Sequence, residues 1–189
     1  NTRLIFENMT YLFHSARLGF RNWSDADIDP MAAISADKEV MKYFPAVATY
    51  EQTAAFIKRM QDEFAETGYC YFAVDELSTN TFIGFIGLSW KTFEADFTPC
   101  VDIGWRLSPS AWNKGFATEG AIRCLDYAFD TLKLAKVYSM APMINTPSER
   151  VMQKAGMIKV GEFEHSLLKD HPELMQCVLY VKSNPVDGH

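Results

Sequence analysis

Apolar and polar residues alternate along several short stretches of the chain, and this period of two is typical of β-strands that bury one face. The stretches predicted as strands are 16–23, 69–75, 81–90, 99–107, 137–141, 157–165 and 175–182. The second and third strands flank Leu77-Ser78-Thr79-Asn80, a turn-forming sequence, so we expect them to pair as a hairpin. The pattern therefore predicts a sheet of about seven strands.

A period near 3.6 replaces this alternation elsewhere and predicts helices over 25–35, 37–44, 50–67, 116–134 and 147–155. Two helix starts carry the residues of a capping box, in which side chains at both ends of the first turn satisfy backbone N–H groups. Thr49 and Gln52 form the first predicted box. Thr146 and Glu149 form the second, with Pro147 at the first helical position. Strands and helices together predict one α+β domain on a mainly antiparallel sheet.

The domain is expected to span residues 15–183, between an N-terminal extension of residues 1–14 and a C-terminal tail of residues 184–189. Met9 is a candidate for the first residue of the natural chain, with residues 1–8 upstream of it. Charged residues interrupt the N-terminal stretch, which therefore lacks the apolar core of a signal peptide. A cytoplasmic protein is the expectation.

Composition narrows the function classes. The chain of 189 residues is 48% hydrophobic and 22% charged, as in ordinary globular proteins, and its net charge is −6. It shows no basic stripe and no apolar run of about 18 residues, so neither nucleic-acid binding nor a membrane span is expected. The cysteines are widely spaced, with no C-x-x-C pair and no His at a zinc-ligand interval, so we expect free thiols and no metal. They are Cys70, Cys100, Cys124 and Cys177.

The stretch SAWNKGFATEGA at 110–121 is a loop that leads into a predicted helix. Backbone N–H groups at a helix start, aided by the helix dipole, bind phosphate oxygens. Gly115 would let a ligand approach the backbone, since a Cβ there would be in the way. The alternative is an ordinary turn before a helix. P-loop, dinucleotide-binding and G-x-S-x-G motifs are all absent from the sequence.

Three segments in this order closely resemble the GNAT acetyltransferase superfamily: IGWRL at 103–107, WNKGFATEGA at 112–121 and INTPSERVMQKAGM at 144–157. The nearest branch is that of the ribosomal-protein-serine and ribosomal-protein-alanine N-acetyltransferases, and the resemblance extends from about residue 15 to 182. It implies the GNAT fold, a mainly antiparallel mixed sheet flanked by helices and splayed at the cofactor site. It also implies acetyl-CoA as co-substrate, an amine acceptor, and a monomer or homodimer.

The resemblance implies two groups of acetyl-CoA contacts. The pantetheine arm would pair with the backbone of one strand, where an exposed N–H could also stabilise the oxyanion. The pyrophosphate would lie on the amides of the loop and first helical turn, and Asn145 and Ser148 would complete the site. The implied cofactor-binding residues are Ile103, Gly104, Trp105, Asn113, Lys114, Gly115, Phe116, Ala117, Thr118, Asn145 and Ser148. A glycine inside a strand, such as Gly104, also often marks a bulge or a place where another backbone or a ligand comes close.

The catalytic residues implied by the resemblance are Ser148, which would support the departing thiolate, and Asn145. With Thr146 and Glu149 supplying the cap, both side chains are expected to be free; the alternative is that they only decorate a helix start. Asp102 and Glu119 are candidates for the general base. The alternatives are a solvated strand position for Asp102 and a favourable helix-dipole interaction for Glu119.

These inferences predict an N-acetyltransferase that transfers acetyl directly from acetyl-CoA to a primary amine. An α-amine with a pKa of ~7.7–8.0 is roughly 10–15% neutral at pH 7, so it needs little help from a base. The acceptor stays open between a protein N-terminus and a small molecule. The alternative function is an acyl-CoA-binding sensor or regulatory module that lacks turnover.

Overall fold

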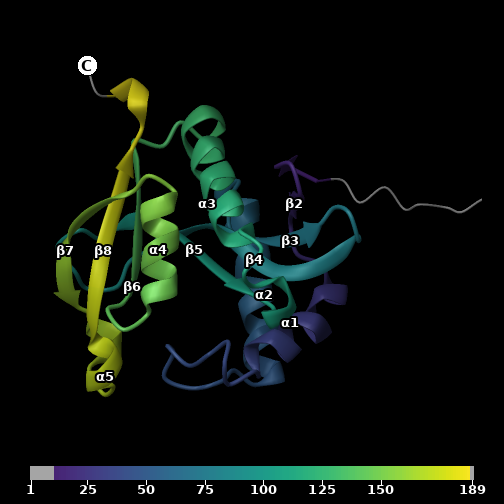
Figure 1. Cartoon of the computed structure of the whole chain (residues 1–189), viewed down its shortest axis with the longest axis horizontal. Helices are drawn as coiled ribbons and strands as arrows, with labels where there is room; N and C mark the ends of the chain where they lie inside the picture. The colour runs from purple at the N-terminus through teal and green to yellow at the C-terminus, as the bar shows by residue number, and fades with distance from the viewer. Residues whose placement is uncertain (1–10, 188–189) are drawn as a thin grey trace, which may run out of the picture.

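The computed structural model describes residues 11–187, and its centre is one eight-stranded sheet in the order β1-β2-β3-β4-β5-β6-β8-β7. All neighbouring strands are antiparallel except β5 and β6. Figure 1 shows β6, β8 and β7 on one side and β2 to β5 on the other. The strands are β1 Phe13–His14, β2 Leu18–Arg21, β3 Tyr71–Glu76, β4 Thr81–Lys91, β5 Cys100–Leu107, β6 Lys136–Pro142, β7 Ile158–Glu164 and β8 Gln176–Ser183.

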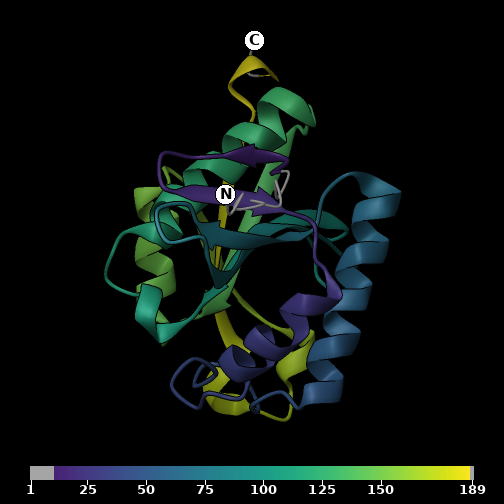
Figure 2. The same ribbon diagram turned by 90° about the vertical axis from the view of Figure 1, so that its right-hand side faces the viewer.

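Helices cover both faces of the sheet (Figures 1 and 2). On one face Phe56 of α2 packs against Phe85 of β4, and on the other Gly120 of α3 packs against Ile86, the next residue of β4. Adjacent residues of a strand point to opposite faces, so α2 and α3 lie on opposite sides. The α-helices are α1 Ile28–Ser35, α2 Tyr50–Thr67, α3 Phe116–Asp126, α4 Thr146–Lys154 and α5 Pro172–Met175.

The parallel contact between β5 and β6 is confined to one register pair, Asp102 with Tyr138. Beyond Asp102 the two strands diverge, whereas β4 stays paired with β5 from Lys91 to Gly84. The predicted splay of a mixed sheet is therefore confirmed. It leaves one edge of β5 without a partner strand in the middle of the molecule, between the two groups of helices.

A buried charge network joins β2 to β3 and to the turn before α1. Arg21 donates from Nη1 and Nη2 to Asp27 at 2.7 and 2.9 Å, and from Nε and Nη2 to Asp75 at 2.8 and 3.0 Å. All three residues are buried, and Tyr11 donates a further hydrogen bond to Asp75. Because each carboxylate is met by two N–H groups, the network fixes the start of the chain against the sheet.

The predicted strands and the helix over 50–67 are confirmed. Gln52 N donates to Thr49 Oγ1, Thr49 N donates to Gln52 Oε1, and Gly68 ends the helix at φ 82°. The eighth strand, β1, was not predicted. It lies within residues 1–14 and pairs with β2, so the sheet begins before residue 15. The candidate start at Met9 lies outside the described residues.

Three helix predictions need correction. Residues 37–44 form turns: Asp37 accepts hydrogen bonds from Glu39 N and Val40 N as an N-cap would, but the backbone bonds that follow, Met41 N to Asp37 O and Phe44 N to Met41 O, do not continue as a helical ladder. So short a segment is marginal as a helix, and Pro45 prevents its extension. Residues 25–27 form a 3-10 turn before α1. The helix expected through 134 is α-helical only to Asp126 and continues as a π-helical turn over Tyr127–Thr131.

Candidate functional site

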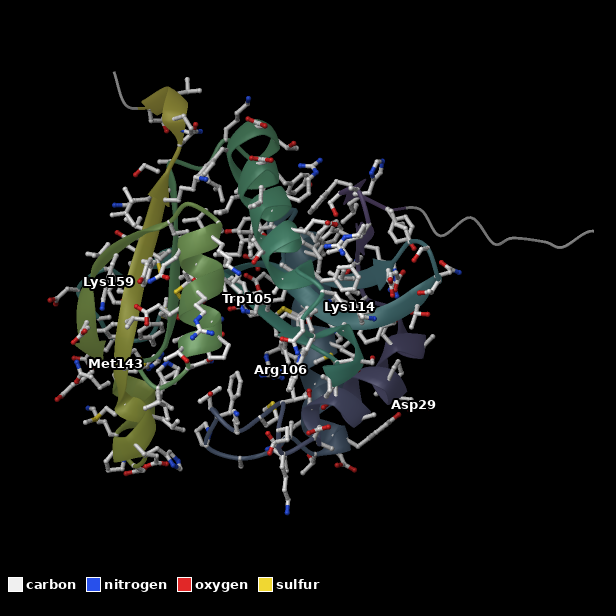
Figure 3. The ribbon with its side chains drawn as sticks, viewed as in Figure 1. Asp29, Trp105, Arg106, Lys114, Met143 and Lys159 are labelled. Carbon is white, nitrogen blue, oxygen red and sulfur yellow. The ribbon has the colours of Figure 1, made fainter. Side chains whose placement is uncertain are left out.

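A cleft of about 820 Å³ opens where β5 and β6 diverge. Its walls come from β5, from the loop before α3, from the first turns of α3 and α4, and from the segment between α1 and α2. In Figure 3, Trp105 and Arg106 of β5 lie near the centre of the molecule, between α4 and α1. Segments far apart in sequence thus meet at one place, which includes most of the residues predicted for acetyl-CoA.

The loop before α3 offers free amides to the cleft. Asn113 and Gly115 both have left-handed backbones, at φ 59° and 77°, and Gly115 is the N-cap of α3. No side chain caps this helix start, so the first-turn N–H groups have no intrahelical or capping partner among the described residues. Asn113, Gly115, Phe116, Ala117 and Thr118 line the cleft. Lys114 is exposed and is not among the lining residues.

Gly115 is required for its conformation rather than for the space that it leaves. A Cβ built on Gly115 would meet only Arg17 Nη2, at 3.5 Å, an ordinary contact. A φ of 77°, in contrast, disfavours residues with a Cβ by about 1–2 kcal/mol, and Asn least.

Replacing Gly115 by Ala should therefore lower stability by about 1 kcal/mol and weaken acetyl-CoA binding, whereas Gly115→Asn should recover much of both. Thermal unfolding and calorimetric titration with acetyl-CoA measure the two effects. Equal damage by Ala and Asn would instead mean that a ligand needs the space of the missing Cβ.

The backbone of β5 presents alternate residues to the open edge. Ile103 O accepts a hydrogen bond from Ser139 Oγ of β6 at 3.0 Å, so the backbone groups of Ile103 face β6. N–H and C=O of one residue in an antiparallel strand point to the same side, and the side alternates along the strand. Trp105 therefore directs its N–H toward the divergent edge, whereas Gly104 faces its register partner Gly87 in β4. Of the three predicted residues, Trp105 best fits the exposed donor.

Gly104 is explained by a side chain. The β4–β5 register runs without a shift, so the glycine marks no bulge. A Cβ on Gly104 would lie 3.2 Å from Cε1 of Tyr71, whose ring covers the glycine from β3. The close neighbour in the structure is thus a side chain, Tyr71, and not another backbone as the sequence suggested, and the glycine allows this ring to reach Asp102.

Asp102 is the buried carboxylate of the cleft, with 6% of its surface exposed, which corrects the alternative of a solvated strand position. Its Oδ1 accepts a hydrogen bond from the Tyr71 hydroxyl at 2.7 Å. Burial raises the pKa of Asp102 to about 6, although the positive charge of Lys91 and the hydrogen bond from Tyr71 act to lower it. Burial and the Asp102 charge raise the pKa of Tyr71, which therefore stays a donor. A carboxylate with this pKa is suited to accept a proton near neutral pH.

Glu119 belongs to a structural contact instead. It accepts hydrogen bonds from Ser15 Oγ at 2.7 Å, from Arg17 N at 3.1 Å and from Arg17 Nε at 2.8 Å. Burial alone would raise the pKa of Glu119, but these hydrogen bonds outweigh it and lower the pKa. Glu119 does not line the cleft. It ties the first turn of α3 to the segment before β2, which disfavours it as general base, and its place in that first turn agrees with the alternative of a favourable helix-dipole interaction.

The start of α4 also differs from the prediction. Asn145, not Thr146, is the N-cap, and its Oδ1 accepts a hydrogen bond from Ser148 N at 3.3 Å. Glu149 accepts instead from the Tyr180 hydroxyl at 2.7 Å, so the predicted capping box does not form. Asn145 is therefore not free: its amide N–H groups alone remain available to a ligand. Both Asn145 and Ser148 line the cleft, and the Ser148 hydroxyl makes no hydrogen bond within residues 11–187.

The polar residues of the cleft that sequence reasoning missed include Tyr71, Lys91 and Arg106. Arg106 had a signal, because Asp102, Gly104 and Arg106 are spaced by two and share one face of the strand. Tyr71 and Lys91 had none, since Lys91 Nζ lies 4.7 Å from the Tyr71 ring only through the pairing of β3, β4 and β5.

No group of three or more His, Cys, Asp or Glu side chains is arranged to hold a metal ion in the described part of the chain. All four cysteines lie in that part, and each is buried with a free thiol. Among residues 11–187, no helix is both long and apolar enough to cross a membrane.

Comparison with known proteins supports the fold and the enzyme class. The family model of the acetyltransferase (GNAT) domain matches residues 17–158. The uncharacterized N-acetyltransferase YnaD of Bacillus subtilis is 33% identical over 154 residues, which are 81% of this chain and 86% of that protein. The crystal structure of a GNAT-family acetyltransferase from Bacillus anthracis has 28% identity and a TM-score of 0.74, over 90% of this chain and 97% of that one.

The ribosomal-protein-S5-alanine acetyltransferase from Vibrio fischeri shares the fold at 17% identity and a TM-score of 0.73, over 92% of this chain and 96% of that one. The resemblance noted from the three sequence segments is thus confirmed at the level of the superfamily. With its match to the family model over residues 17–158, its splayed sheet and its uncapped helix start at one cleft, the chain belongs to the GNAT family of N-acetyltransferases.

Proposed function

We propose that this N-acetyltransferase takes acetyl-CoA as its co-substrate and transfers the acetyl group directly to a primary amine. The observation that supports the proposal most strongly is that a buried carboxylate and an uncapped helix start share one cleft. Acetyl-CoA supplies an activated thioester. The protein supplies binding, alignment and a place for the proton, and most of the acceleration is expected from alignment.

The residues of the cleft fit the shape and charge of this co-substrate. The free amides of Phe116, Ala117 and Thr118 face the cleft at the N-terminal end of the α3 dipole, where an anionic pyrophosphate binds well. Arg150 and Lys154 of α4 line the same cleft and add positive charge. The divergent edge of β5 leaves backbone groups for an extended pantetheine arm, as the family resemblance implies.

The chemical roles follow from the same geometry. Asp102 takes the proton from the amine, directly or through water, while Tyr71 holds its carboxylate in place. The Trp105 N–H donates to the carbonyl oxygen as negative charge develops there. Ser148 donates to the departing thiolate. A cysteine nucleophile is not needed, and burial raises the pKa of Cys177 at the cleft to about 11, so that its thiolate is scarce at neutral pH.

The test is thiol release on mixing the protein with acetyl-CoA and an amine panel. The panel contains peptides with free N-termini, amino acids, polyamines and aminoglycosides. Amine-dependent release of CoA with formation of the acetylated amine supports the proposal. Tight binding of acetyl-CoA without release for any amine would instead indicate a sensor or regulatory module.

Replacing Ser148 by Ala should lower kcat by about 10–100-fold with little change in acetyl-CoA affinity, because the hydroxyl acts when the thiolate departs. The matched control is Thr146→Ala in the same helical turn. Thr146 is exposed and does not cap the helix, so this change should alter kcat by less than about twofold. Unchanged turnover in Ser148→Ala would refute the role of the hydroxyl.

A further inference from the structure

Arg106 is a positively charged residue of the cleft, and it has no acidic partner among the described residues. It lies on β5 on the same face as Asp102 and Gly104, and it faces α1, where its Nη1 donates to Ser35 Oγ at 3.2 Å. Its Nε is closed off from solvent and has no hydrogen-bond partner within residues 11–187. No carboxylate of the described residues forms a salt bridge with Arg106.

Aromatic rings hold the guanidinium in position. Its carbon Cζ lies 4.6 Å from the ring centre of Phe44 and 5.3 Å from that of Phe85. These contacts stabilise a cation only in part, and burial still lowers the pKa of Arg106 to about 10. A planar guanidinium with an unused N–H is suited to pair with a carboxylate, since the two groups match in shape.

The charge of the whole cleft favours the same kind of ligand. Five basic side chains line it against two acidic ones, although the protein carries a net charge of −6. The basic residues are Lys42, Lys91, Arg106, Arg150 and Lys154, and the acidic residues are Glu39 and Asp102. Arg150 and Lys154 are assigned above to the phosphates of acetyl-CoA, which leaves Lys42, Lys91 and Arg106 against Glu39 and Asp102 for the acceptor. A polycationic acceptor, such as a polyamine, would still meet like charges here, and like-charge contacts disfavour binding.

We propose that the acceptor is a zwitterion, a short peptide or amino-acid derivative whose amine faces Asp102 and whose carboxylate pairs with Arg106. This inference rests on the proposed function and names the substrate class of the same cleft. Asp102 and Arg106 are four residues apart in an extended strand, about 13 Å between Cα atoms. The rings of Tyr71 and Phe85, stacked with centres 5.0 Å apart, lie between them. This spacing favours a carboxylate at least one residue removed from the reacting amine.

The experiment compares di-, tri- and tetra-alanine as free acids and as C-terminal amides, with acetyl-CoA saturating and the pH set so that both amines are equally neutral. We expect kcat/KM of the wild type to favour the acid by about tenfold or more for at least one length. In Arg106→Gln this preference should fall to about twofold or less. Arg59→Gln, which changes an exposed arginine that does not itself line the cleft, should retain the preference.

The outcomes separate this inference from the proposed function. Equal use of acids and amides by the wild type, or a retained preference in Arg106→Gln, would overturn the zwitterion while acetyl transfer stands. A higher kcat/KM for spermidine than for every peptide would overturn it as well. Absence of thiol release with any amine would contradict the proposed function itself. If Arg106→Gln does not fold, as judged by acetyl-CoA binding, the comparison of acids with amides in the wild type still decides.

Discussion

Replacing Asp102 by Asn is expected to lower kcat/KM for the amine by about 100-fold, since a positioned general base contributes 10²–10⁴-fold. The loss should lie at the low end of that range for an α-amine, part of which is already neutral at pH 7. Asn has the shape of Asp and can still accept the hydrogen bond of Tyr71, so the change isolates the proton acceptor. Steady-state kinetics with saturating acetyl-CoA measure the effect.

The pH dependence identifies the group. In the wild type, kcat/KM should rise with an inflection near pH 6, where Asp102 ionises, and again at the pKa of the amine. Only the second inflection moves when acceptors with different amine pKa values are compared. Asp102→Asn should lose the inflection near pH 6 and keep the other. If the variant retained both, Asp102 would be eliminated as the base. The control is Asp126→Asn, which changes an exposed carboxylate and should leave both inflections in place.

Stability provides a second readout for Asp102 that does not depend on activity. The pKa of this carboxyl is raised by about two units on folding, so the folded state binds the proton more tightly. Ionisation therefore opposes folding, and wild-type stability should fall as the pH rises from about 4 to above 6. At 1.36 kcal/mol per unit, Asp102→Asn should gain about 2–3 kcal/mol relative to the wild type over this range. Urea unfolding at several pH values measures the gain.

Replacing Arg21 by Met should lower the free energy of unfolding by about 3–5 kcal/mol, because it leaves two buried carboxylates without their cation. Such a loss is a large part of the 5–15 kcal/mol that typically stabilises a domain. Asp27 and Asp75 then face each other with no positive charge between them. Urea unfolding of the variant and the wild type measures the loss.

The matched control is Lys58→Met, which removes a cation from the exposed pair of Lys58 and Asp62 on α2. Exposed pairs of this kind contribute roughly 0.3–0.5 kcal/mol, so the control should be close to the wild type in urea unfolding. A loss below about 1 kcal/mol in Arg21→Met would show that the network is not the stabilising feature described above.

The local signals in the sequence were sufficient for most of the fold. Alternation of apolar and polar residues placed the main strands, and the Thr49–Gln52 box with Gly68 bounded α2, because each of these signals acts within one element. The strand β1 was missed because two residues are too few to show a period. The predicted helix over 37–44 failed because the segment before Pro45 is too short to hold a helical ladder, although Asp37 binds the first N–H groups as an N-cap would.

The candidate site also divides into residues that local sequence motifs indicate and residues whose roles depend on tertiary contacts. The residues of the cofactor side lie in short motifs that are continuous in sequence, so the resemblance of these motifs to the GNAT superfamily pointed to the amides near Gly115 and to the start of α4. The capping of α4 could not be predicted from its own residues, because Tyr180 of β8 donates a hydrogen bond to the Glu149 carboxylate. The role of Glu119 depended on Ser15 and Arg17, about a hundred residues earlier in the chain.

The sequence by itself therefore determined the elements, the superfamily and the loop that presents its amides, since these depend on neighbours within a turn or a strand. Only the tertiary structure decided between Asp102 and Glu119, and only it revealed Tyr71 and the unpaired Arg106. Burial, pKa and hydrogen-bond partners are properties of contacts between distant segments. Water is excluded from Asp102 and Arg106 by the packing of β3, β4, β5 and α1, which come from separate segments of the chain.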